Sequence, residues 1–533
     1  MIKLETKITT KKPKPILWTI SGADCSGGAG IAADIKTAHH LDVEVCHLIT
    51  ANTVQNSTKL LSINPTEVTI LAEQAKALRF DKPPSAIKIG LIANSEQLSW
   101  LIRLLSELKQ QITKLIVVYD PVGQASVGGS LSTIHTDALL PLMPLIDVMT
   151  PNLIEAKQLS KLIDSCTEND NIAISKKIMN LGCNAVIVKG GHQDDINDKK
   201  NADVSKYCLD TCVQKLVSND LQSYQLKSSY IETSHSHGGG CSFASALACF
   251  LAHDYLLRDA FTLTKAYINQ GLTFSQQEQQ ARREASTNKD IASRYYGAFE
   301  QRDWPSQASY FPTVMASLSD KHLCLSAFQT LNLAKHERLG LYPVIDSIEW
   351  LERLLPLSIK IIQLRIKNKS NEELDVIIKK AVTLAKKYSC RLFINDYWQL
   401  AIKHGAYGVH IGQEDLAQAD LAAISAAGLR LGISTHGCYE FLLAQQLQPS
   451  YLAVGAIFPT KTKDMTGQIQ GVDNLQYLLA LANNIPVVAI GGINQQRLAE
   501  VWNTGVSAVA VVTAITEAEQ PIGTTNTMLG ALN

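Results

Sequence analysis

Apolar, β-branched runs alternate with amphipathic segments along the first half of the chain. Between Pro15 and about Leu272 these runs fall at 16–20, 46–50, 86–92, 114–120, 146–150 and 185–190. Strand-like runs separated by helical segments are typical of a doubly wound α/β domain. The pattern therefore predicts an α/β domain of this kind over residues 1–273.

The strand rhythm stops in a polar, charged stretch and resumes at Leu339. We expect residues 274–336 to form a linker or interdomain helices, and a second domain to span 337–533. Eight strand candidates follow, at 341–345, 360–364, 391–395, 407–411, 430–434, 451–455, 486–490 and 508–512. Eight β/α units predict a closed (β/α)8 TIM barrel, smaller than the usual one.

The length, charge balance and cysteine content of the chain limit which partners and which cell compartment we expect. A chain of 533 residues exceeds what one core usually serves, and its 49 basic and 49 acidic residues cancel. This balance gives no electrostatic reason to expect nucleic acid or an anionic membrane. The 11 cysteines form no CxxC pair, which favours free thiols in a reducing compartment. With neither a signal peptide nor a run of 18 apolar residues, we expect a cytoplasmic protein that could form a homo-oligomer.

Polar residues follow the predicted barrel strands, where barrel enzymes carry their chemistry. Arg365, Lys367 and Lys463 supply positive charge for phosphates. Asp396 and Asp415 offer the hard oxygen ligands that suit Mg²⁺. Glycines 491–492 end the seventh strand, where backbone N–H groups can approach an anion. The rim therefore predicts a site for one metal-bound diphosphate and one monophosphate.

The motifs QLRIK, IND, GVHIGQED, GISTH, AVGAIFPTKTK, PVVAIGGI and AVVTAI follow one another in this order over 337–516. In this they resemble thiamine-phosphate synthase, which joins hydroxymethylpyrimidine diphosphate to thiazole monophosphate and releases pyrophosphate. The resemblance implies that the pyrimidine diphosphate is bound by Gln363, Arg365, Lys367, Asn395, Ser434 and Lys463. It implies Mg²⁺ at Asp396 and Asp415, and thiazole phosphate at Thr460, Thr462, Gly492, Val512 and Thr513.

Two glycine-rich segments in the first half, 21–37 and 235–252, each follow a strand and open a helix. Such a turn presents free backbone N–H groups to an anion. Neither is a Walker A loop, because no GK[ST] follows the glycines. A tight strand–helix turn without a ligand would look similar, so both interpretations stay open on this pattern alone.

Further motifs give the first half a resemblance of its own. DPVGQASVGGS, TPNLIEA, VKGGH and HGGGCSFASAL resemble ribokinase-like kinases, and SGGAG with Cys241 is similar to hydroxymethylpyrimidine and phosphomethylpyrimidine kinase over 15–272. The resemblance implies catalytic roles for Lys189 and Cys241, pyrimidine binding by Gln55, Asp34 and Gly22, and an ATP and anion site of Asp120, Glu155, Gly238, Gly239 and Gly240.

Within this resemblance, Cys241 stands where related sugar kinases have an Asp base. A place at a helix N-terminus would lower its pKa and favour a functional role, although most buried cysteines are inert apolar residues. The chain departs from the family where Gly239 replaces Thr, where Ala23 and Cys25 replace other residues, and where Gly123 replaces Met.

Together the patterns predict one bifunctional enzyme of thiamine biosynthesis that uses ATP and Mg²⁺ and acts on small molecules. Two alternatives stay open. In the first, the kinase half acts on pyridoxal-type rings. In the second, it is a binding module that senses a pyrimidine without phosphorylating it, an idea that the intact Lys189 and Asp120 disfavour.

Overall fold

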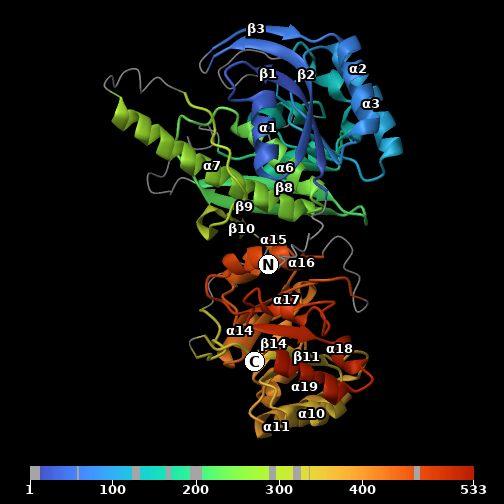
Figure 1. Ribbon diagram of the computed structural model, residues 1–533, viewed down its shortest axis with the longest axis vertical. Helices are drawn as coiled ribbons and strands as arrows, with labels where there is room; N and C mark the ends of the chain where they lie inside the picture. The colour runs from blue at the N-terminus through green and yellow to red at the C-terminus, as the bar shows by residue number, and fades with distance from the viewer. Residues whose placement is uncertain are drawn as a thin grey trace, which may run out of the picture. The chain divides into compact units, whose positions relative to one another are not determined.

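The chain folds into two compact units. The computed structural model describes residues 13–56, 59–122, 132–163, 170–191, 207–286, 296–315, 326–334, 336–460 and 469–532 (Figure 1). Internal contacts divide the chain into one unit of Met1–Pro305 with Tyr310–Pro312 and another of Ser306–Ser309 with Thr313–Asn533. Across these described ranges, no helix combines the length and the apolar character that a bilayer crossing needs.

A mixed β-sheet forms the centre of the first unit and confirms the predicted doubly wound fold. Its strands lie in the order β9-β8-β7-β6-β5-β4-β1-β2-β3. Neighbours from β7 to β2 are parallel, and antiparallel pairing adds β8, β9 and β3 outside them. The strands are β1 (Ile16–Asp24), β2 (Glu44–Gln55), β3 (Leu60–Pro65), β4 (Ala86–Ile89), β5 (Ile116–Tyr119), β6 (Val148–Met149), β7 (Ala185–Val188), β8 (Tyr207–Lys215) and β9 (Leu221–Ser229).

Helices cover both faces of this sheet (Figure 1). Along β1, Trp18 and Ile20 join an apolar core with residues of α2 to α5, whereas Thr19 bonds to Asp34 of α1 on the other face. Burial on both faces explains why the parallel strands are almost continuously apolar. The helices are α1 (Gly30–His40), α2 (Val68–Asp81), α3 (Ser95–Gln111), α4 (Leu153–Ser160), α5 (Asn171–Met179), α6 (Gly239–Ala252) and α7 (Leu257–Ala285), with short turns η1 (Thr136–Leu139) and η2 (Met143–Leu145).

Eight parallel strands close into a barrel in the second unit, so every strand predicted there is confirmed. They are β11 (Gly340–Ile345), β12 (Ile361–Leu364), β13 (Arg391–Asn395), β14 (Gly408–Ile411), β15 (Arg430–Thr435), β16 (Tyr451–Val454), β17 (Val487–Ile490) and β18 (Ala508–Val511). The other elements are η4 (Ala308–Tyr310), β10 (Thr313–Met315), α10 (Ile348–Leu354), η5 (Leu355–Leu357), α11 (Asn371–Lys387), α12 (Trp398–His404), α13 (Gln413–Leu416), α14 (Leu421–Ala426), α15 (Cys438–Gln446), α16 (Gly471–Ala480), α17 (Leu498–Trp502), α18 (Thr513–Thr516) and α19 (Pro521–Ala531).

Large aromatic rings fill the barrel where neighbouring strands provide glycine. Tyr342, Phe393 and Tyr451 are buried in the central cluster. A Cβ atom at Gly408 would lie 2.4 Å from the Phe393 ring, and one at Gly432 would lie 2.2 Å from the Tyr451 ring. A side chain at either glycine would therefore overlap an aromatic ring, so the small interior depends on this pairing of large and absent side chains.

Residues on both sides of position 273 belong to one helix of the first unit. Helix α7 runs without interruption to Ala285, and the first unit extends to Pro305. Phe299 is buried against α7, because a Cβ atom at Gly271 would lie 2.1 Å from its ring. The Trp304 ring lies 5.0 Å from that of Phe250 on α6, measured between centroids. Part of the expected linker is therefore the outer layer of the first unit.

The second unit likewise begins before the expected residue 337. Phe328 and Leu331 are buried, and the Phe328 N–H donates to the Gln448 carbonyl at 3.1 Å. The Ser450 hydroxyl donates to the Gln329 carbonyl at 2.6 Å. Residues 326–334 thus close the amino end of the barrel, which polar sequence alone did not reveal.

This extended boundary can be tested at Phe299. Phe299→Ala should lower the free energy of unfolding of the first unit by about 3–5 kcal/mol, since a buried ring leaves a cavity. The measurement is urea denaturation of the full chain, followed separately by the activity of each unit. Phe80→Ala is the matched control, because Phe80 is 84% exposed and its truncation should cost almost nothing. Equal effects of the two changes would contradict the boundary.

Candidate active sites

The loop between β1 and α1 is organised by a carboxylate. Asp24 accepts backbone N–H groups of Ser26 at 2.8 Å and Ala29 at 2.9 Å, and His237 Nε2 lies 2.7 Å from its Oδ2. Burial alone would raise the pKa of Asp24, but hydrogen bonds from His237, Gln55 and Ser26 hold it well below its usual range. The loop that opens α1 is therefore tied to the segment that opens α6.

Close backbone contact fixes the start of α6. Gly238 has φ +85°, and a Cβ atom there would lie 1.9 Å from the Gly28 carbonyl oxygen, so only glycine fits. Gly239 is the first helical residue and does not have a left-handed backbone. A Cβ atom at Gly240 would lie 3.7 Å from Lys189 Nζ. The N-terminus of α6 therefore faces the lysine ammonium, and of its first N–H groups that of Gly239 donates to the Ser236 carbonyl at 3.0 Å.

Lys189 belongs to a compact group of charges after strands β5 and β7. Its Nζ lies 2.7 Å from Asp120 Oδ1, which also accepts the Thr150 hydroxyl at 3.1 Å. Glu155 accepts the Asn152 N–H at 2.8 Å. Burial raises the pKa of Glu155 to about 7, against the opposing charge of Lys189 and with the help of Asp120. One ammonium, two carboxylates and a helix N-terminus thus converge in the first unit.

The other kinase residues named from the sequence lie at the same end of the sheet. Gln55 ends β2, and its backbone carbonyl lies 3.0 Å from the Cys25 thiol. Gly22 lies at the register shift of β1, where a Cβ atom would come within 2.7 Å of the Leu91 side chain. Both residues border the loop that Asp24 organises.

Three charged residues meet on the rim of the barrel in the second unit. Burial and the neighbouring Asp415 raise the pKa of Asp396, while the charge of Arg365 and the Gly412 N–H oppose this. Asn395 donates to the Asp396 carboxylate. The structure therefore brings Asp396, Asp415 and Arg365 together, as the sequence predicted. Lys367 lies beyond them and is exposed.

A chain of neutral hydrogen bonds runs through the barrel to this rim. Gln363 Nε2 donates to Tyr342 Oη at 3.4 Å, and Tyr342 Oη lies 2.8 Å from Tyr451 Oη. His410 Nδ1 lies 2.7 Å from Tyr451 Oη, and its Nε2 lies 2.8 Å from Ser434 Oγ. Burial, with a smaller effect of Arg365, lowers the pKa of His410 to about 3, so the imidazole is neutral.

His410 links the interior of this chain to Ser434. A neutral imidazole donates from one ring nitrogen and accepts at the other, so of its bonds to Tyr451 Oη and Ser434 Oγ one is donated and the other accepted. In the tautomer that accepts from Tyr451, His410 donates to Ser434 and leaves the Ser434 proton for a ligand at the rim.

The opposite part of the rim offers backbone groups. Gly491 and Gly492 have φ +101° and +64°, and a Cβ atom at Gly492 would lie 2.5 Å from the Pro459 carbonyl oxygen. Val512 precedes α18, and Thr513 is its first residue. Thr460 is half-buried, whereas Thr462 and Lys463 lie outside the described residues. The described part of the predicted phosphate site therefore surrounds glycines that tolerate no side chain.

Comparison with known proteins agrees with this geometry. The family model for phosphomethylpyrimidine kinase matches residues 24–285, and that for thiamine monophosphate synthase matches 341–515. The thiamine-phosphate synthase of Citrobacter koseri is 54% identical over 182 residues, which cover 34% of this chain and 86% of that protein. The chain belongs to the thiamine-phosphate synthase family. With the kinase family matched in its first unit, it is a bifunctional enzyme of thiamine biosynthesis.

Solved structures resemble the kinase unit. The phosphomethylpyrimidine kinase from Clostridium difficile is 29% identical, with a TM-score of 0.38, and the match covers 48% of this chain and 99% of that one. The pyridoxal kinase from Staphylococcus aureus in complex with AMP-PCP is 28% identical, with a TM-score of 0.41, and the match covers 49% and 88%.

The predicted role of Asp34 in the kinase pocket needs correction. Its side chain is fully buried, and both of its oxygens lie 2.9 Å from Lys88 Nζ. Thr19 and Ser245 donate to the same carboxylate. With four hydrogen bonds and no exposure, Asp34 stabilises the contact of α1 with β4 and α6 and has no surface for a pyrimidine.

Several residues of the two sites escaped the sequence analysis. Lys88 of the kinase unit was hidden in the apolar run AIKIGLI, where a lone lysine was the one signal. Asp24 and His237 lay inside quoted motifs but received no role. In the synthase unit, His410 lay in GVHIGQED, and Arg497 donates to the Gly492 carbonyl at 2.7 Å. Lys88, His237 and His410 were missed because their partners Asp34, Asp24 and Tyr451 are remote in sequence.

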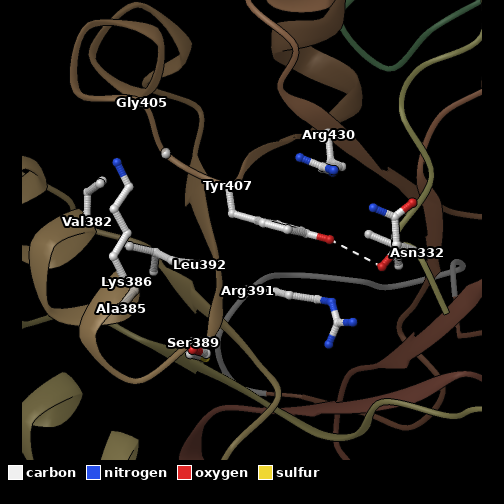
Figure 2. A pocket seen from close by; sticks show the side chains of 13 residues that line it. Asn332, Val382, Ala385, Lys386, Ser389, Arg391, Leu392, Gly405, Tyr407 and Arg430 are labelled. Carbon is white, nitrogen blue, oxygen red and sulfur yellow. Dashed lines mark hydrogen bonds between the residues drawn. The ribbon is translucent and has the colours of Figure 1, made fainter.

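A cavity of about 560 Å³ lies at the other end of the barrel, where β13, β14 and β15 begin. Figure 2 shows the Tyr407 ring with Arg391 and Arg430 on either side of it. The Arg430 guanidinium lies 4.5 Å from the Tyr407 ring centroid and donates to the Thr330 carbonyl. Lys386 lies in the last turn of α11, where the helix dipole favours a cation. These contacts account for the charges of Arg430 and Lys386. The cavity lies at the end of the barrel opposite the catalytic rim.

The expected low pKa of Cys241 also needs correction. Burial raises the pKa of this thiol; Lys88 opposes that effect, whereas Asp34 and Asp120 add to it. A protonated thiol can donate a hydrogen bond but cannot serve as a strong base at neutral pH.

We therefore expect Cys241→Ser to keep the phosphorylation rate within about tenfold, because a general base is worth about 10²–10⁴-fold and none is lost. The measurement is kcat with hydroxymethylpyrimidine phosphate. Cys25→Ser, at an exposed thiol of the same unit, is the control for a change of sulfur to oxygen. A hundredfold loss of kcat that is seen in Cys241→Ser and not in Cys25→Ser would support Cys241 as a general base.

The hydrogen-bond chain of the synthase unit gives a second test. His410→Phe should lower kcat/KM about tenfold or more, because Ser434 loses the hydrogen-bond partner that fixes its hydroxyl. The variant Ser434→Ala with His410→Phe should be no slower than Ser434→Ala alone, since both act through one hydroxyl. His404→Phe is the control: His404 binds Asp375 on the outer helices and should leave synthesis unchanged. Additive losses would show that His410 does not act through Ser434.

Proposed function

We propose that the kinase unit phosphorylates hydroxymethylpyrimidine and then its monophosphate with ATP, and that the synthase unit joins the resulting diphosphate to thiazole phosphate. Small molecules would be its partners, in the cytoplasm. The observation that carries the proposal for the kinase unit is the convergence of Lys189, Asp120 and Glu155 with the N-terminus of α6. Phosphoryl transfer needs fixed positive charge and N–H donors at one point.

In this proposal, Lys189 and the N-terminus of α6 at Gly239 and Gly240 hold the transferring phosphate, with the Gly240 N–H as the donor, because the Gly239 N–H donates to the Ser236 carbonyl at 3.0 Å. Gly238 provides the turn that opens the helix at this point. Asp120 orients Lys189 through their 2.7 Å ion pair. Gln55 and Gly22 border the pyrimidine, and Cys241 contributes a neutral thiol that can donate a hydrogen bond.

Asp120 and Glu155 would hold Mg²⁺ in the kinase unit. Both are carboxylates, the ligands that this hard cation prefers. Burial and the nearby Asp120 disfavour the charged form of Glu155, so the site has a surplus of negative charge that a divalent cation would relieve. When bound, Mg²⁺ neutralises charge on the phosphates of the nucleotide.

Asp396 and Asp415 would hold Mg²⁺ in the synthase unit. Burial and the neighbouring charge of Asp415 raise the pKa of Asp396, so a divalent cation would relieve the surplus of negative charge at this point of the rim. Magnesium usually takes one or two protein carboxylates and completes its shell with phosphate and water. A bound Mg²⁺ would stabilise the leaving pyrophosphate.

The remaining residues of the synthase unit would hold its two substrates. Arg365 would compensate the diphosphate charge, and Ser434 would donate its free proton. The proposed pyrimidine diphosphate site is completed by Gln363, Lys367, Asn395 and Lys463. The proposed thiazole phosphate site comprises Thr460, Thr462, Gly492, Val512 and Thr513. No strong general base is required, because the thiazole nitrogen attacks as the pyrophosphate leaves.

The two activities should separate by mutation. Lys189→Ala should lower phosphorylation at least a thousandfold, since it removes the cation at the transferring phosphate, and should leave synthesis from supplied diphosphate intact. Asp396→Ala should do the reverse. The measurements are ATP consumption with hydroxymethylpyrimidine or pyridoxal, and formation of thiamine phosphate.

Each variant serves as the control for the other, because it reports on folding of the whole chain. Consumption of ATP with pyridoxal alone would overturn the proposed substrate and favour a pyridoxal-type kinase. No consumption with either ring would favour a pyrimidine-binding module. Loss of both activities in a folded single variant would contradict independent sites.

A further inference from the structure

A buried ion pair lies beside the loop that carries Lys189. Lys265 of α7 and Asp210 of β8 lie 2.6 Å apart, measured from Nζ to Oδ2, and their side chains are 6% and 3% exposed. The other oxygen of Asp210 accepts the backbone N–H of Gly190 at 3.1 Å. One carboxylate therefore joins helix α7 to the residue that directly follows Lys189.

This carboxylate acts where the strand ladder ends. Strands β7 and β8 pair antiparallel as far as Val188 and Thr211. Beyond that point, the Lys189 N–H donates to the Pro151 carbonyl at 2.9 Å, and the next N–H, of Gly190, donates to Asp210. Two successive N–H groups are thus held by different acceptors, which fixes the direction in which the Lys189 side chain leaves the sheet.

Gly190 allows this close approach. A Cβ atom at this position would lie 2.4 Å from the Leu209 carbonyl oxygen. The backbone after Lys189 is therefore pressed against β8, and a small displacement of Asp210 would be transmitted directly to it. The ammonium of Lys189 lies on the other side of this contact, 2.7 Å from Asp120.

Stability alone does not account for a buried pair of this kind. Removing two charges from water costs several kcal/mol per ion, and well-packed apolar replacements are often neutral or stabilising. Burial lowers the pKa of Lys265, but the charges of Asp210 and Cys208 and the hydrogen bond to Asp210 together raise it, which favours the ammonium form. The distinctive contribution of the pair is the acceptor that it holds beneath Gly190.

We propose that Asp210 and Lys265 are positioning residues for phosphoryl transfer: Lys265 fixes the carboxylate of Asp210, which fixes the Gly190 peptide and so aims Lys189. This inference rests on the proposed function, in which Lys189 contacts the ATP phosphates. A misplacement of about 1 Å in a catalytic group can cost about a hundredfold in rate.

The test uses the full chain with two paired substitutions. In Asp210→Leu with Lys265→Met, the buried charges are removed together and Gly190 loses its acceptor. Here kcat for phosphorylation should fall about a hundredfold, while the dissociation constant of the pyrimidine should stay within threefold. In Asp210→Asn with Lys265→Met, the side-chain oxygen beneath Gly190 is retained, and kcat should stay within about tenfold of the wild type.

A matched control lies in the same sheet, near the amino ends of strands β5 and β6. Lys109 and Asp147 form an ion pair at 2.7 Å, and Asp147 accepts the Val117 N–H at 2.8 Å, remote from Lys189. Lys109→Met with Asp147→Leu should change stability but not kcat. Synthesis from supplied diphosphate should be unchanged in every variant and reports that the chain is folded.

The outcomes separate the inference from the function on which it rests. If Lys189→Ala phosphorylates normally, the proposed function fails. If Lys189→Ala is inactive and the Leu/Met variant matches the Lys109–Asp147 control, the positioning role fails. Should the Leu/Met variant not fold, Asp210→Glu decides. Its longer side chain keeps the charge but shifts the acceptor, so an unchanged kcat would overturn the inference and a tenfold loss would support it.

Discussion

Both units depend on one constraint, which is that parallel strands bring their carboxyl ends to the same edge. In the kinase unit, Asp120 follows β5 and Lys189 follows β7. In the synthase unit, Asn395 ends β13 and Ser434 lies near the end of β15. Residues remote in sequence thereby meet without any segment having to reach across the fold. Reversing a single central strand would send its terminal residues to the opposite edge.

The two units solve the problem of buried polarity differently. The kinase unit contains three largely buried Lys–Asp pairs, at Lys88, Lys189 and Lys265. The barrel interior instead carries a neutral chain through His410, whose charged form is disfavoured by burial. A closed barrel excludes water from every side, so an unpaired charge there would cost several kcal/mol. Asp396, Asp415 and Arg365 lie on the rim, where substrate and solvent can balance their charge.

Hydrophobic alternation was sufficient to predict the parallel strands of both folds, because burial on two faces leaves a direct mark on sequence. The barrel rim was predictable for the same reason: Asp396 and Asp415 follow strands whose direction is fixed. The ion pair between Asp34 and Lys88 was not predictable, since the sequence around one residue gives no sign of the other. The raised pKa of Cys241 escaped for a related reason, because burial outweighed the helix end that the motif revealed.

Local sequence patterns were least informative for segments whose structure depends on tertiary packing. The polar stretch after residue 273 predicted a linker or interdomain helices, and it could not show that α7 continues into it as far as Ala285 or that Phe299 packs on that helix. One aromatic residue in a polar context carries too little signal to identify a buried face. The hairpin of β8 and β9 was missed as well, although it supplies the Asp210 carboxylate.

The glycines that make room for aromatic rings in the barrel also bear on how this enzyme can evolve. Gly432 admits the Tyr451 ring, and the Tyr451 hydroxyl supports His410. A larger residue at position 432 could be accepted only together with a smaller one at 451, and that change would remove the hydroxyl. Positions 432 and 451 are therefore expected to change together in evolution or to stay unchanged. The volume available inside the barrel therefore limits which substitutions can be accepted at the residues that support the catalytic rim.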